Sequence, residues 1–333
     1  MKTFTWLGIL LLLVAAGPAR ADNPNIGTAG AQFLQIPVGG RAAAMGGAVV
    51  ANSRDASSLF WNPAGMVNIP GGSLFAAHTQ WWATIALNHA AFVYSLEDIG
   101  SFGFSATSLT MDPMDVTTEL QPEGTGQSFD ARDLMVGVSY ARKLTEDFAV
   151  GVTAKYVSQQ IWNEKAGGIA FDVGTQYRLG LGDLTVGMCM SNYGDNLRFD
   201  GKDLDVKLDA DPQAPFNRLS PARLQSEEYP LPLHFQVGVS MTVVTLDYFE
   251  AMMALDVTHP NDTRERVNLG TELRIAQNFF LRGGYRINYD SESGTLGAGI
   301  VVPLKDLRVN FDYAYAMYDL LPNIHRISLG VDF

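Results

Sequence analysis

The chain has 333 residues, of which 47% are hydrophobic and only 17% are charged, and its net charge is −12. No stretch after residue 20 holds the roughly 18 consecutive apolar residues that a transmembrane helix requires, and the acidic balance argues against nucleic-acid binding. A single cysteine, Cys189, excludes a disulfide scaffold and a thiolate metal site. The chain is therefore unusually apolar and glycine-rich, yet its sequence contains no transmembrane helix.

The N-terminus has the three parts of a secretory signal peptide. Lys2 supplies a positive charge, residues 7–16 are apolar, and Ala19 and Ala21 form a small-x-small cleavage site before Asp22. We predict that residues 1–21 are removed on export. No cysteine follows this cleavage site, so we do not expect a lipoprotein anchor.

Residues 22–71 show no apolar alternation and are too few and too rich in glycine to build a core of their own. They contain two strings of small residues, Gly46-Gly47-Ala48 and Asn62-Pro63-Ala64-Gly65. Small side chains allow a backbone to approach a wall closely, and a proline fixes an extended or turn conformation at the residue before it. We therefore predict that this segment is a plug, or hatch, inside the structure that residues 72–333 form.

From Gly72 onward apolar and polar residues alternate, which is the pattern of β-strands. The C-terminal residues are the clearest case, with Ile327 and Leu329 on one face and Arg326 and Ser328 on the other. The alternation predicts fourteen strands, near residues 72–83, 86–96, 100–118, 129–144, 148–160, 167–179, 183–193, 230–244, 249–258, 265–275, 279–289, 294–302, 306–318 and 324–333.

The connections between these predicted strands alternate in length. Short turns fall at 97–98, 145–147, 180–182, 245–248, 276–278 and 303–305, and longer loops at 111–128, 161–166, 194–229, 259–264, 290–293 and 319–323. A β-sandwich also alternates, but strands of about ten residues with little charge match a bilayer-spanning length. The sequence predicts an all-β fold, a transmembrane antiparallel β-barrel of about 14 strands in the outer membrane, with the short turns in the periplasm.

The strand face opposite to the lipid lines the lumen of such a barrel. The predicted lumen face carries ionisable residues of both signs: Lys155, Asp172, Arg178, Asp256, Glu272, Arg274, Arg282, Arg286, Arg308 and Asp312. Because unpaired charges in a dry lumen would be costly, we expect them to pair across strands or to bond the hatch. An ion-selective pore lining is the alternative.

The longest loops are the candidate contact surfaces for a partner or a ligand, because loops of this length are usually functional or disordered. The side chains predicted to make such contacts are Trp162, Phe216, Leu219 and Leu224. The same region holds an acidic stretch, Asp200, Asp203, Asp205, Asp209 and Asp211. We interpret this stretch as a solvated surface, with a calcium site as the less favoured reading.

The sequence offers no catalytic constellation. The strings around Ser139 and Ser240 lack the closing glycine of a GxSxG nucleophile elbow, and the HExxH and P-loop motifs are absent. The five histidines are scattered over different strands and loops without carboxylates at metal-ligand spacing. We therefore expect no enzyme activity, no metal and no cofactor.

The hatch segment carries a resemblance to a known family. The string from Phe33 to Gly65 reads FLQIPVGGRAAAMGGAVVANSRDASSLFWNPAG and resembles the N-terminal hatch signature of the PorV/PorQ family, which is related to FadL-type transporters. A looser similarity continues through residues 133–162. The resemblance implies that Gly46-Gly47-Ala48 and Asn62-Pro63-Ala64 are the GGA and NPA elements of the hatch. It also implies an outer-membrane barrel that acts in type IX secretion.

Two functions remain open at this point. A PorV-like barrel would bind a secreted cargo protein or a secretion-system subunit through its outer loops. A FadL-like barrel would instead pass fatty acids or other hydrophobic small molecules through a break in its wall, and the glycine pairs Gly167-Gly168 and Gly283-Gly284 are candidates for that break. Outer-membrane lipid is an expected contact in both cases, and nucleic acid in neither.

Overall fold

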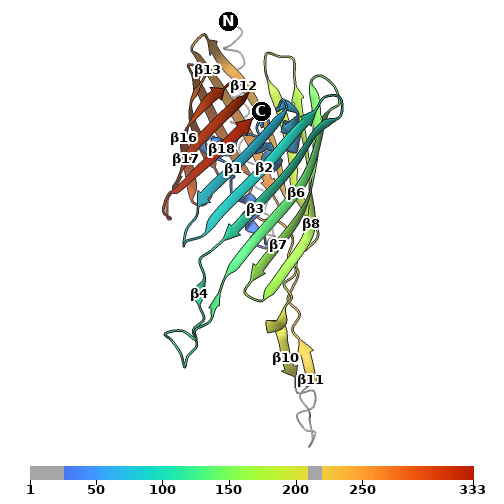
Figure 1. The fold of residues 1–333 in the computed structure, drawn as a ribbon, viewed down its shortest axis with the longest axis vertical. Helices are drawn as coiled ribbons and strands as arrows, with labels where there is room; N and C mark the ends of the chain where they lie inside the picture. The colour runs from blue at the N-terminus through green and yellow to red at the C-terminus, as the bar shows by residue number, and fades with distance from the viewer. Residues whose placement is uncertain (1–25, 209–219) are drawn as a thin grey trace, which may run out of the picture.

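The computed structural model describes residues 26–208 and 220–333, which form a closed barrel around a short N-terminal segment (Figure 1). Fourteen antiparallel strands make the barrel, which confirms the predicted fold class and strand number. The barrel strands are β1 (Gly72–Gln80), β2 (Ala86–Leu96), β3 (Gly100–Thr110), β6 (Ala131–Lys143), β7 (Phe148–Ile161), β8 (Glu164–Arg178), β9 (Thr185–Gly194), β12 (His234–Leu246), β13 (Phe249–Pro260), β14 (Arg266–Ile275), β15 (Phe279–Ile287), β16 (Glu292–Leu304), β17 (Leu307–Tyr318) and β18 (Ile324–Asp332).

The first and last strands close the barrel. β1 pairs with β18 from Ser73 opposite Asp332 to Gln80 opposite His325, so neither strand leaves an open edge in the wall. Side chains on the outer face are exposed and apolar or aromatic, as a lipid-facing surface requires. Examples are Leu74, Phe92, Phe102, Phe104, Val152, Phe171, Leu281 and Phe311.

Short turns gather at one end of the barrel and longer connections at the other, which we call the turn end and the loop end. The connection between β7 and β8 is an exception, because Trp162 and Asn163 alone join the two strands at the loop end. The predicted loop over 161–166 is wrong there. Glu164 and Lys165 interrupt the apolar alternation, yet both pair with β7 in the ladder.

Prolines explain two further differences between predicted and observed strand bounds. The strand expected over 100–118 ends at Thr110, and Pro113 follows shortly after. The strand expected from residue 230 begins at His234, after Pro230 and Pro232. Proline has no N–H to donate to a ladder, so these segments cannot pair as the alternation alone suggests.

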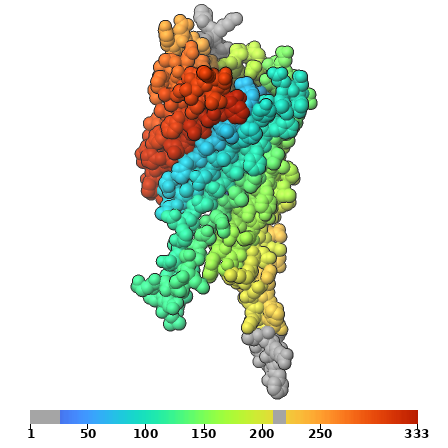
Figure 2. Space-filling model, viewed as in Figure 1, coloured from blue at the N-terminus to red at the C-terminus, as the bar shows by residue number. Residues whose placement is uncertain are grey.

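Two hairpins project beyond the loop end of the barrel (Figures 1 and 2). The first pairs β4 (Met114–Asp115) with β5 (Ser128–Phe129), and the second pairs β10 (Asp205–Leu208) with β11 (Ser220–Arg223). Each forms a two-stranded sheet of its own, separate from the barrel. The long loop predicted over 194–229 therefore contains a β-hairpin.

The segment before β1 folds into four short helical turns inside the barrel. They are η1 (Gln32–Gln35), α2 (Gly40–Ala44), α3 (Ser58–Trp61) and η2 (Pro63–Asn68). None of the helices in the described part of the chain is long and apolar enough to cross a membrane. The predicted signal peptide lies outside the described residues.

Candidate functional site

The hatch, which we define as residues 26–71, crosses the lumen and braces opposite sides of the wall. α2 contacts β15 to β18, whereas η2 contacts β3 and β6 to β8, half a turn away in the strand order. Two cavities lie on either side of it, about 960 Å³ at the turn end and about 750 Å³ at the loop end. No described residue lines both cavities, so the hatch separates them.

Asn62 fastens the second half of the hatch to the wall. Its Oδ1 accepts a hydrogen bond from Ala64 N at 3.1 Å, which caps η2, and Pro63 occupies the first position of that helix. Its Nδ2 donates to Val50 O within the hatch at 2.8 Å and to Thr175 O of β8 at 3.0 Å. The fully buried Asn62 side chain thus joins two hatch segments and one wall strand.

Gly46 and Gly47 fasten the first half. Both have positive φ, 67° and 84°, in the left-handed region where glycine carries no steric cost. The turn they form presents Gly46 O to Arg286 Nε at 3.0 Å and Gly47 O to Gln236 Nε2 at 3.2 Å. Ala48 is fully buried directly after this turn.

The wall is thinned by glycines where the hatch touches it. A Cβ at Gly174 of β8 would lie 2.0 Å from Asn62 Oδ1, and one at Gly151 of β7 would lie 2.4 Å from Ala64 N. On the far side, a Cβ at Gly284 of β15 would lie 2.2 Å from Gly46 N. Gly187, Gly238, Gly270 and Gly297 meet the hatch in the same way. These seven glycines, together with Gly103 of β3, which faces Leu59 and Met66, form the surface against which the hatch is seated.

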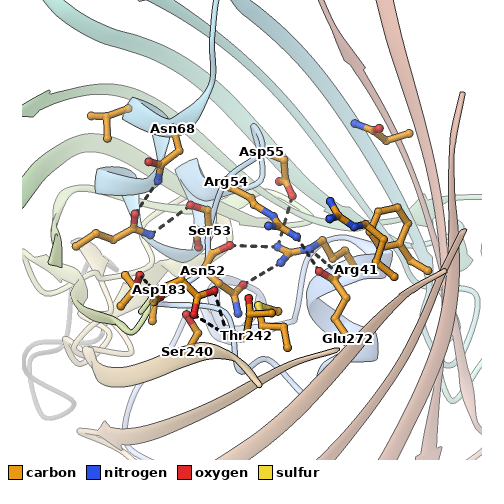
Figure 3. A pocket seen from close by; sticks show the side chains of 18 of the residues that line it. Arg41, Asn52, Ser53, Arg54, Asp55, Asn68, Asp183, Ser240, Thr242 and Glu272 are labelled. Atoms are coloured by element: carbon orange, nitrogen blue, oxygen red, sulfur yellow. Dashed lines mark hydrogen bonds and ion pairs between the residues drawn. The ribbon is translucent and has the colours of Figure 1, made fainter. Parts of the chain in front are cut away.

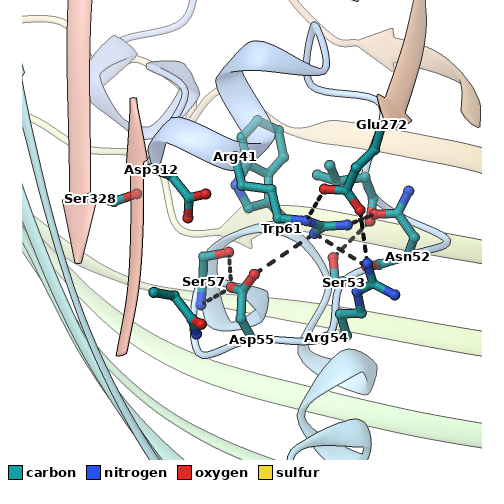
Figure 4. A network of polar contacts seen from close by, with 12 residues as sticks. Arg41, Asn52, Ser53, Arg54, Asp55, Ser57, Trp61, Glu272, Asp312 and Ser328 are labelled. Atoms are coloured by element: carbon teal, nitrogen blue, oxygen red, sulfur yellow. Dashed lines mark hydrogen bonds and ion pairs between the residues drawn. The ribbon is translucent and has the colours of Figure 1, made fainter. Parts of the chain in front are cut away.

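Glu272 of β14 is the centre of a buried ionic network that ties the hatch to the wall (Figure 4). Its carboxylate accepts from Arg41 Nε at 3.0 Å and Arg54 NH2 at 2.8 Å, both in the hatch, and from Arg282 Nε of β15 at 2.6 Å. Arg282 also donates to Asp312 Oδ1 at 2.6 Å. Glu272 and Arg282 are both buried, so their charges are compensated mainly by each other and by the hatch.

Most of the other predicted lumen residues also have partners of opposite charge. Lys155 Nζ lies 2.7 Å from Asp172 Oδ1, and Arg308 NH2 lies 3.1 Å from Asp332 Oδ2. Arg274 pairs with Glu250, and Arg286 pairs with Glu292. Asp256 Oδ2 accepts from Val50 N of the hatch at 3.0 Å. Arg178 is exposed and lines the turn-end cavity.

The turn-end cavity is polar and of mixed charge (Figure 3). Hatch residues Asn52, Arg54 and Asp55 form one side, and the ends of wall strands form the other. In the wall, Asp183 accepts hydrogen bonds from Thr242 N at 3.0 and 3.1 Å. The acidic and basic side chains that line this space are balanced in number, so it favours neither cations nor anions.

The loop-end cavity combines apolar walls with charged side chains of both signs, which are Lys155, Arg266, Arg286, Asp133, Asp172, Asp290 and Glu292. Its apolar surface comes from the hatch and from the loop-end connections: Phe33, Leu34, Ile36, Phe60, Trp61, Trp81, Trp82, Leu109, Met135 and Leu321. Arg266 and Arg286 line another part of it. A cavity of this size and composition is typical of a site for a small molecule with an apolar body.

The candidate contact residues of the outer loops are only partly described. Trp162 and Leu224 have exposed side chains at the loop end. Phe216 and Leu219 lie outside the described residues. Asp209 and Asp211 of the acidic stretch also lie outside them, while Asp200 and Asp205 both bind Arg223. In residues 26–208 and 220–333, no group of three or more histidine, cysteine or carboxylate side chains could hold a metal ion.

Tyr229 connects the base of the long loop to the start of the hatch. Its ring occupies the space beside Gly30, where a Cβ would lie 2.2 Å from the ring, and its hydroxyl donates to Gln159 Oε1 at 3.0 Å. Burial, together with the nearby Asp133 carboxylate, raises the pKa of Tyr229 to about 12. The hydroxyl therefore remains protonated and available as a donor throughout the physiological range.

The β10–β11 hairpin gives a prediction of pH dependence. Arg223 Nε donates to Asp205 Oδ1 at 2.6 Å, and this bond lowers the pKa of the Asp205 carboxyl. Because the pKa of Asp205 is lowered, its ion pair with Arg223 stabilises the hairpin at pH values above the usual pKa of aspartate. This stabilisation is lost as the pH falls through the lowered pKa. Carboxyl NMR titration of Asp205 should therefore show a higher midpoint in Arg223→Gln and an unchanged one in Lys207→Gln. An unchanged midpoint in Arg223→Gln would contradict the assignment.

Comparison with known proteins supports the architecture. The family model described as "Type IX secretion system protein PorV" matches residues 19–202. The chain belongs to the PorV family. A search of curated proteins found no match.

Among solved structures, the CymD monoaromatic hydrocarbon channel is 15% identical over 89% of this chain and 97% of its own, with a TM-score of 0.55. The Pseudomonas putida toluene transporter TodX is 12% identical over 88% and 96%, with a TM-score of 0.54.

A Pseudomonas aeruginosa FadL homologue shows the same fold at 12% identity, covering 90% of this chain and 98% of its own, with a TM-score of 0.54. The PorV match and the shared fold place the chain among outer-membrane β-barrels. For this PorV-family member, the proposed wall break is wrong at Gly283-Gly284, which lies in continuous ladders with β14 and β16. Gly167-Gly168 pairs with β7, but the ladder between β8 and β9 begins only at Ala170, so a break at this pair stays a prediction.

Several residues that fix the hatch of this PorV-family chain to the wall could not be recognised in the sequence. Arg41 and Arg54 stand in the hatch segment but were not singled out, because no pattern there indicated which wall residue they would meet. Gln236 was overlooked because a single glutamine in an alternating strand carries no signal of its own. Six of the seven wall glycines lie near the middle of a predicted strand or in its second half, away from turns. Glycine is unusual at such positions, so these residues could be recognised as a set in the sequence.

Proposed function

We propose that this barrel holds an exported protein, or a subunit of the secretion machinery, on its two loop-end hairpins while the hatch keeps the lumen closed. The observation that carries the proposal is the projection of both hairpins beyond the rim of the barrel (Figure 2). Their apolar side chains are solvent-exposed, with Leu120 at 93% and Leu224 at 57% of full exposure. Apolar side chains held away from the barrel are suited to contact with a protein partner.

The hatch supports the same function. Ion pairs, the Asn62 bonds and the glycine contacts fix it across the lumen, so the described part of the chain carries no open route for a folded protein. A partner would therefore be handled at the surface and would not pass through the barrel. The proposal assigns no chemical reaction to the chain.

The test is recovery of partners with the full tagged chain from its own host, in mild detergent, with identification by mass spectrometry. An exported protein or a secretion subunit should dominate. Leu120→Asp combined with Leu224→Asp should lower its recovery roughly tenfold, as expected when interface anchors are lost. Leu181→Asp is the matched control, because Leu181 is similarly exposed in a turn at the opposite end. Unchanged recovery in the double variant and in a deletion of residues 200–226 would overturn the proposal.

A second function, binding and passage of hydrophobic small molecules, is favoured by one observation. The loop-end cavity lies between the hatch and the aromatic residues Trp81, Trp82 and Tyr318. The structural relatives include a toluene transporter and a monoaromatic hydrocarbon channel. Co-purification of a hydrophobic compound instead of a protein would favour this function over the first.

A further inference from the structure

The outer wall of the barrel is mostly apolar, but polar side chains gather in one part of it. This part lies at the loop end of β18, β1, β2 and β3, which are neighbours in the barrel and face the viewer in Figures 1 and 2. Its side chains point away from the lumen, because residues that alternate with them, such as Ala77 and Thr79, are buried. We call this part the wall patch, and its exposed or partly exposed members are His78, Gln80, Asn88, Ser108, Thr110 and His325.

Strand register brings the members of the wall patch together. His78 of β1 lies opposite Asn88 of β2, and Asn88 lies opposite Ser108 of β3. Gln80, the last residue of β1, lies opposite His325 of β18. Side chains that lie opposite one another on neighbouring strands are about 5 Å apart, so these residues form one surface.

The wall patch belongs to the part of the barrel that spans the membrane. A strand needs about 9–11 residues to cross a bilayer, and β1 has only 9. Two of its outward side chains, His78 and Gln80, are nevertheless polar. β15 also has 9 residues, and its outward positions are Phe279, Leu281, Gly283, Tyr285 and Ile287. A strand that faces lipid alone is expected to resemble β15, so β1 indicates a different neighbour at its loop end.

His78 and Asn88 have hydrogen-bonding capacity left over. His78 Nδ1 and Asn88 Oδ1 are 2.8 Å apart. An amide oxygen can only accept, so Nδ1 carries the proton and Nε2 of the neutral ring is an acceptor. In residues 26–208 and 220–333, neither His78 Nε2 nor Asn88 Nδ2 has a hydrogen-bond partner. An acceptor and a donor therefore both face outward, where lipid tails offer them nothing.

The order of side chains along the wall indicates what kind of surface fits. Toward the turn end, the wall patch is followed by Ala76, Ala90 and Ala106, which lie side by side on β1, β2 and β3. Bulky apolar side chains then follow on the same strands, among them Leu74 and Phe92. Small side chains let a second wall come close, and hydrogen bonds between polar side chains hold membrane proteins together. The matching surface must therefore offer neutral donors and acceptors at the same depth as the wall patch.

A second copy of this chain meets these conditions. Two copies have the same orientation in the membrane, so a twofold axis along the membrane normal relates them and keeps every residue at its own depth. The polar zone then faces the polar zone, and the alanines face the alanines. An axis that passes between β1 and β2 sets His78 of each copy against Asn88 of the other, so the acceptor and the donor left over in one copy meet those of the other.

We propose that the wall patch is the contact surface of a homodimer in the outer membrane, in which Asn88 Nδ2 of each copy donates to His78 Nε2 of the other. β3 leads from Thr110 into the hairpin that begins with β4, so the dimer holds the two copies of this hairpin on the same side of the joint. The inference goes beyond the proposed function, because it concerns the outer wall and needs neither a secreted partner nor a small-molecule ligand.

The test is disulfide cross-linking in outer membranes of the host, with the full chain carrying one introduced cysteine. The natural Cys189 is buried, so it does not contribute. Ala90→Cys places a thiol at the centre of the contact surface, and oxidation with copper phenanthroline should give a product of twice the mass. Val257→Cys is the matched control, because Val257 is exposed on β13, on the opposite side of the barrel from β2. The control should give at least about tenfold less of this product.

Further variants, made together with Ala90→Cys, test the wall patch itself. His78→Leu and Asn88→Leu each remove one group of the bonds between the copies and should lower the yield of the dimer several-fold. Thr271→Leu is the matched control, because Thr271 lies opposite the exposed Met253 on the outer wall, away from the wall patch. It should leave the yield unchanged. Heat-dependent migration on gels verifies that the barrel of each variant is folded.

Three results would overturn the proposal. Equal yields with Ala90→Cys and Val257→Cys would mean that the product comes from random collisions. A yield that neither His78→Leu nor Asn88→Leu lowers would show that the wall patch does not hold the copies together. Cross-linking of Ala90→Cys to a different protein, identified by mass spectrometry, would assign the surface to that protein. Partner recovery from the host is measured separately and tests only the protein-binding role.

Discussion

Glu272→Ala is expected to loosen the hatch and to open the lumen to ions. The substitution removes the one carboxylate that Arg41, Arg54 and Arg282 share. Arg282 keeps its ion pair with Asp312 and Arg54 is half-exposed, so the buried Arg41 of the hatch, left with only a longer contact to Asp55, loses most. Breaking a buried ion pair by deleting one partner costs about 3–5 kcal/mol. Here the two arginines that lose their main partner belong to the hatch, so we expect the cost to be relieved by displacement of the hatch, with the barrel wall left intact.

Planar bilayer recordings of the purified protein measure this effect. Wild-type protein should remain closed, whereas Glu272→Ala should show sustained conductance, and limited proteolysis should cut its hatch faster. Glu272→Gln keeps the shape of the side chain and should give an intermediate result. The barrel itself should keep its heat-dependent migration on gels, because the strand ladders do not depend on this side chain.

The control is Glu250→Ala, which removes a lumen carboxylate that pairs with Arg274 within the wall and has no hydrogen bond or ion pair to the hatch among the described residues. If the hatch is held by Glu272 specifically, Glu250→Ala stays closed. Equal conductance in the two variants would mean that general loss of lumen charge, and not release of the hatch, opens the barrel.

The strands could be predicted from the sequence because each one has two chemically different surroundings. Lipid on one side and the lumen on the other impose a period of two that survives in strands as different as β1 and β14. The predicted strand bounds are wrong where charged residues or a proline interrupt the apolar alternation. Glu164 and Lys165 carry charges but extend the ladder beyond the apolar belt, and Pro113 ends an alternation that would otherwise continue.

The contacts between hatch and wall could not be predicted in the same way, because they join distant parts of the chain. Composition was enough to mark residues 22–71 as a hatch, and the resemblance marked Asn62 within it. The partners of Asn62 and Arg41 lie 113 and 231 positions away, on strands β8 and β14. Which wall residue faces which hatch residue depends on strand register and on the height of the hatch in the lumen, and neither quantity is encoded in a local pattern.

Gly174→Ala is expected to prevent the hatch from seating. The added methyl group would lie 2.0 Å from Asn62 Oδ1 and 2.9 Å from Pro63 Cδ, and a wall strand bonded on both sides cannot move away to make room. The hatch must therefore shift, and Asn62 loses its bonds to Thr175 and Ala64. Each buried polar group left unpaired costs about 1–3 kcal/mol, so we expect a loss of several kcal/mol and faster proteolysis of the hatch.

Gly283→Ala is the matched control, because the same methyl group in β15 would meet only Leu296 Cδ2, at 3.8 Å. It should leave hatch proteolysis and thermal unfolding close to wild type. Combining Gly174→Ala with Asn62→Ala removes the atom that the methyl group strikes, so the double variant should lose less stability than the sum of the two single variants. Strict additivity would show that the cost of a side chain at Gly174 does not come from its contact with Asn62.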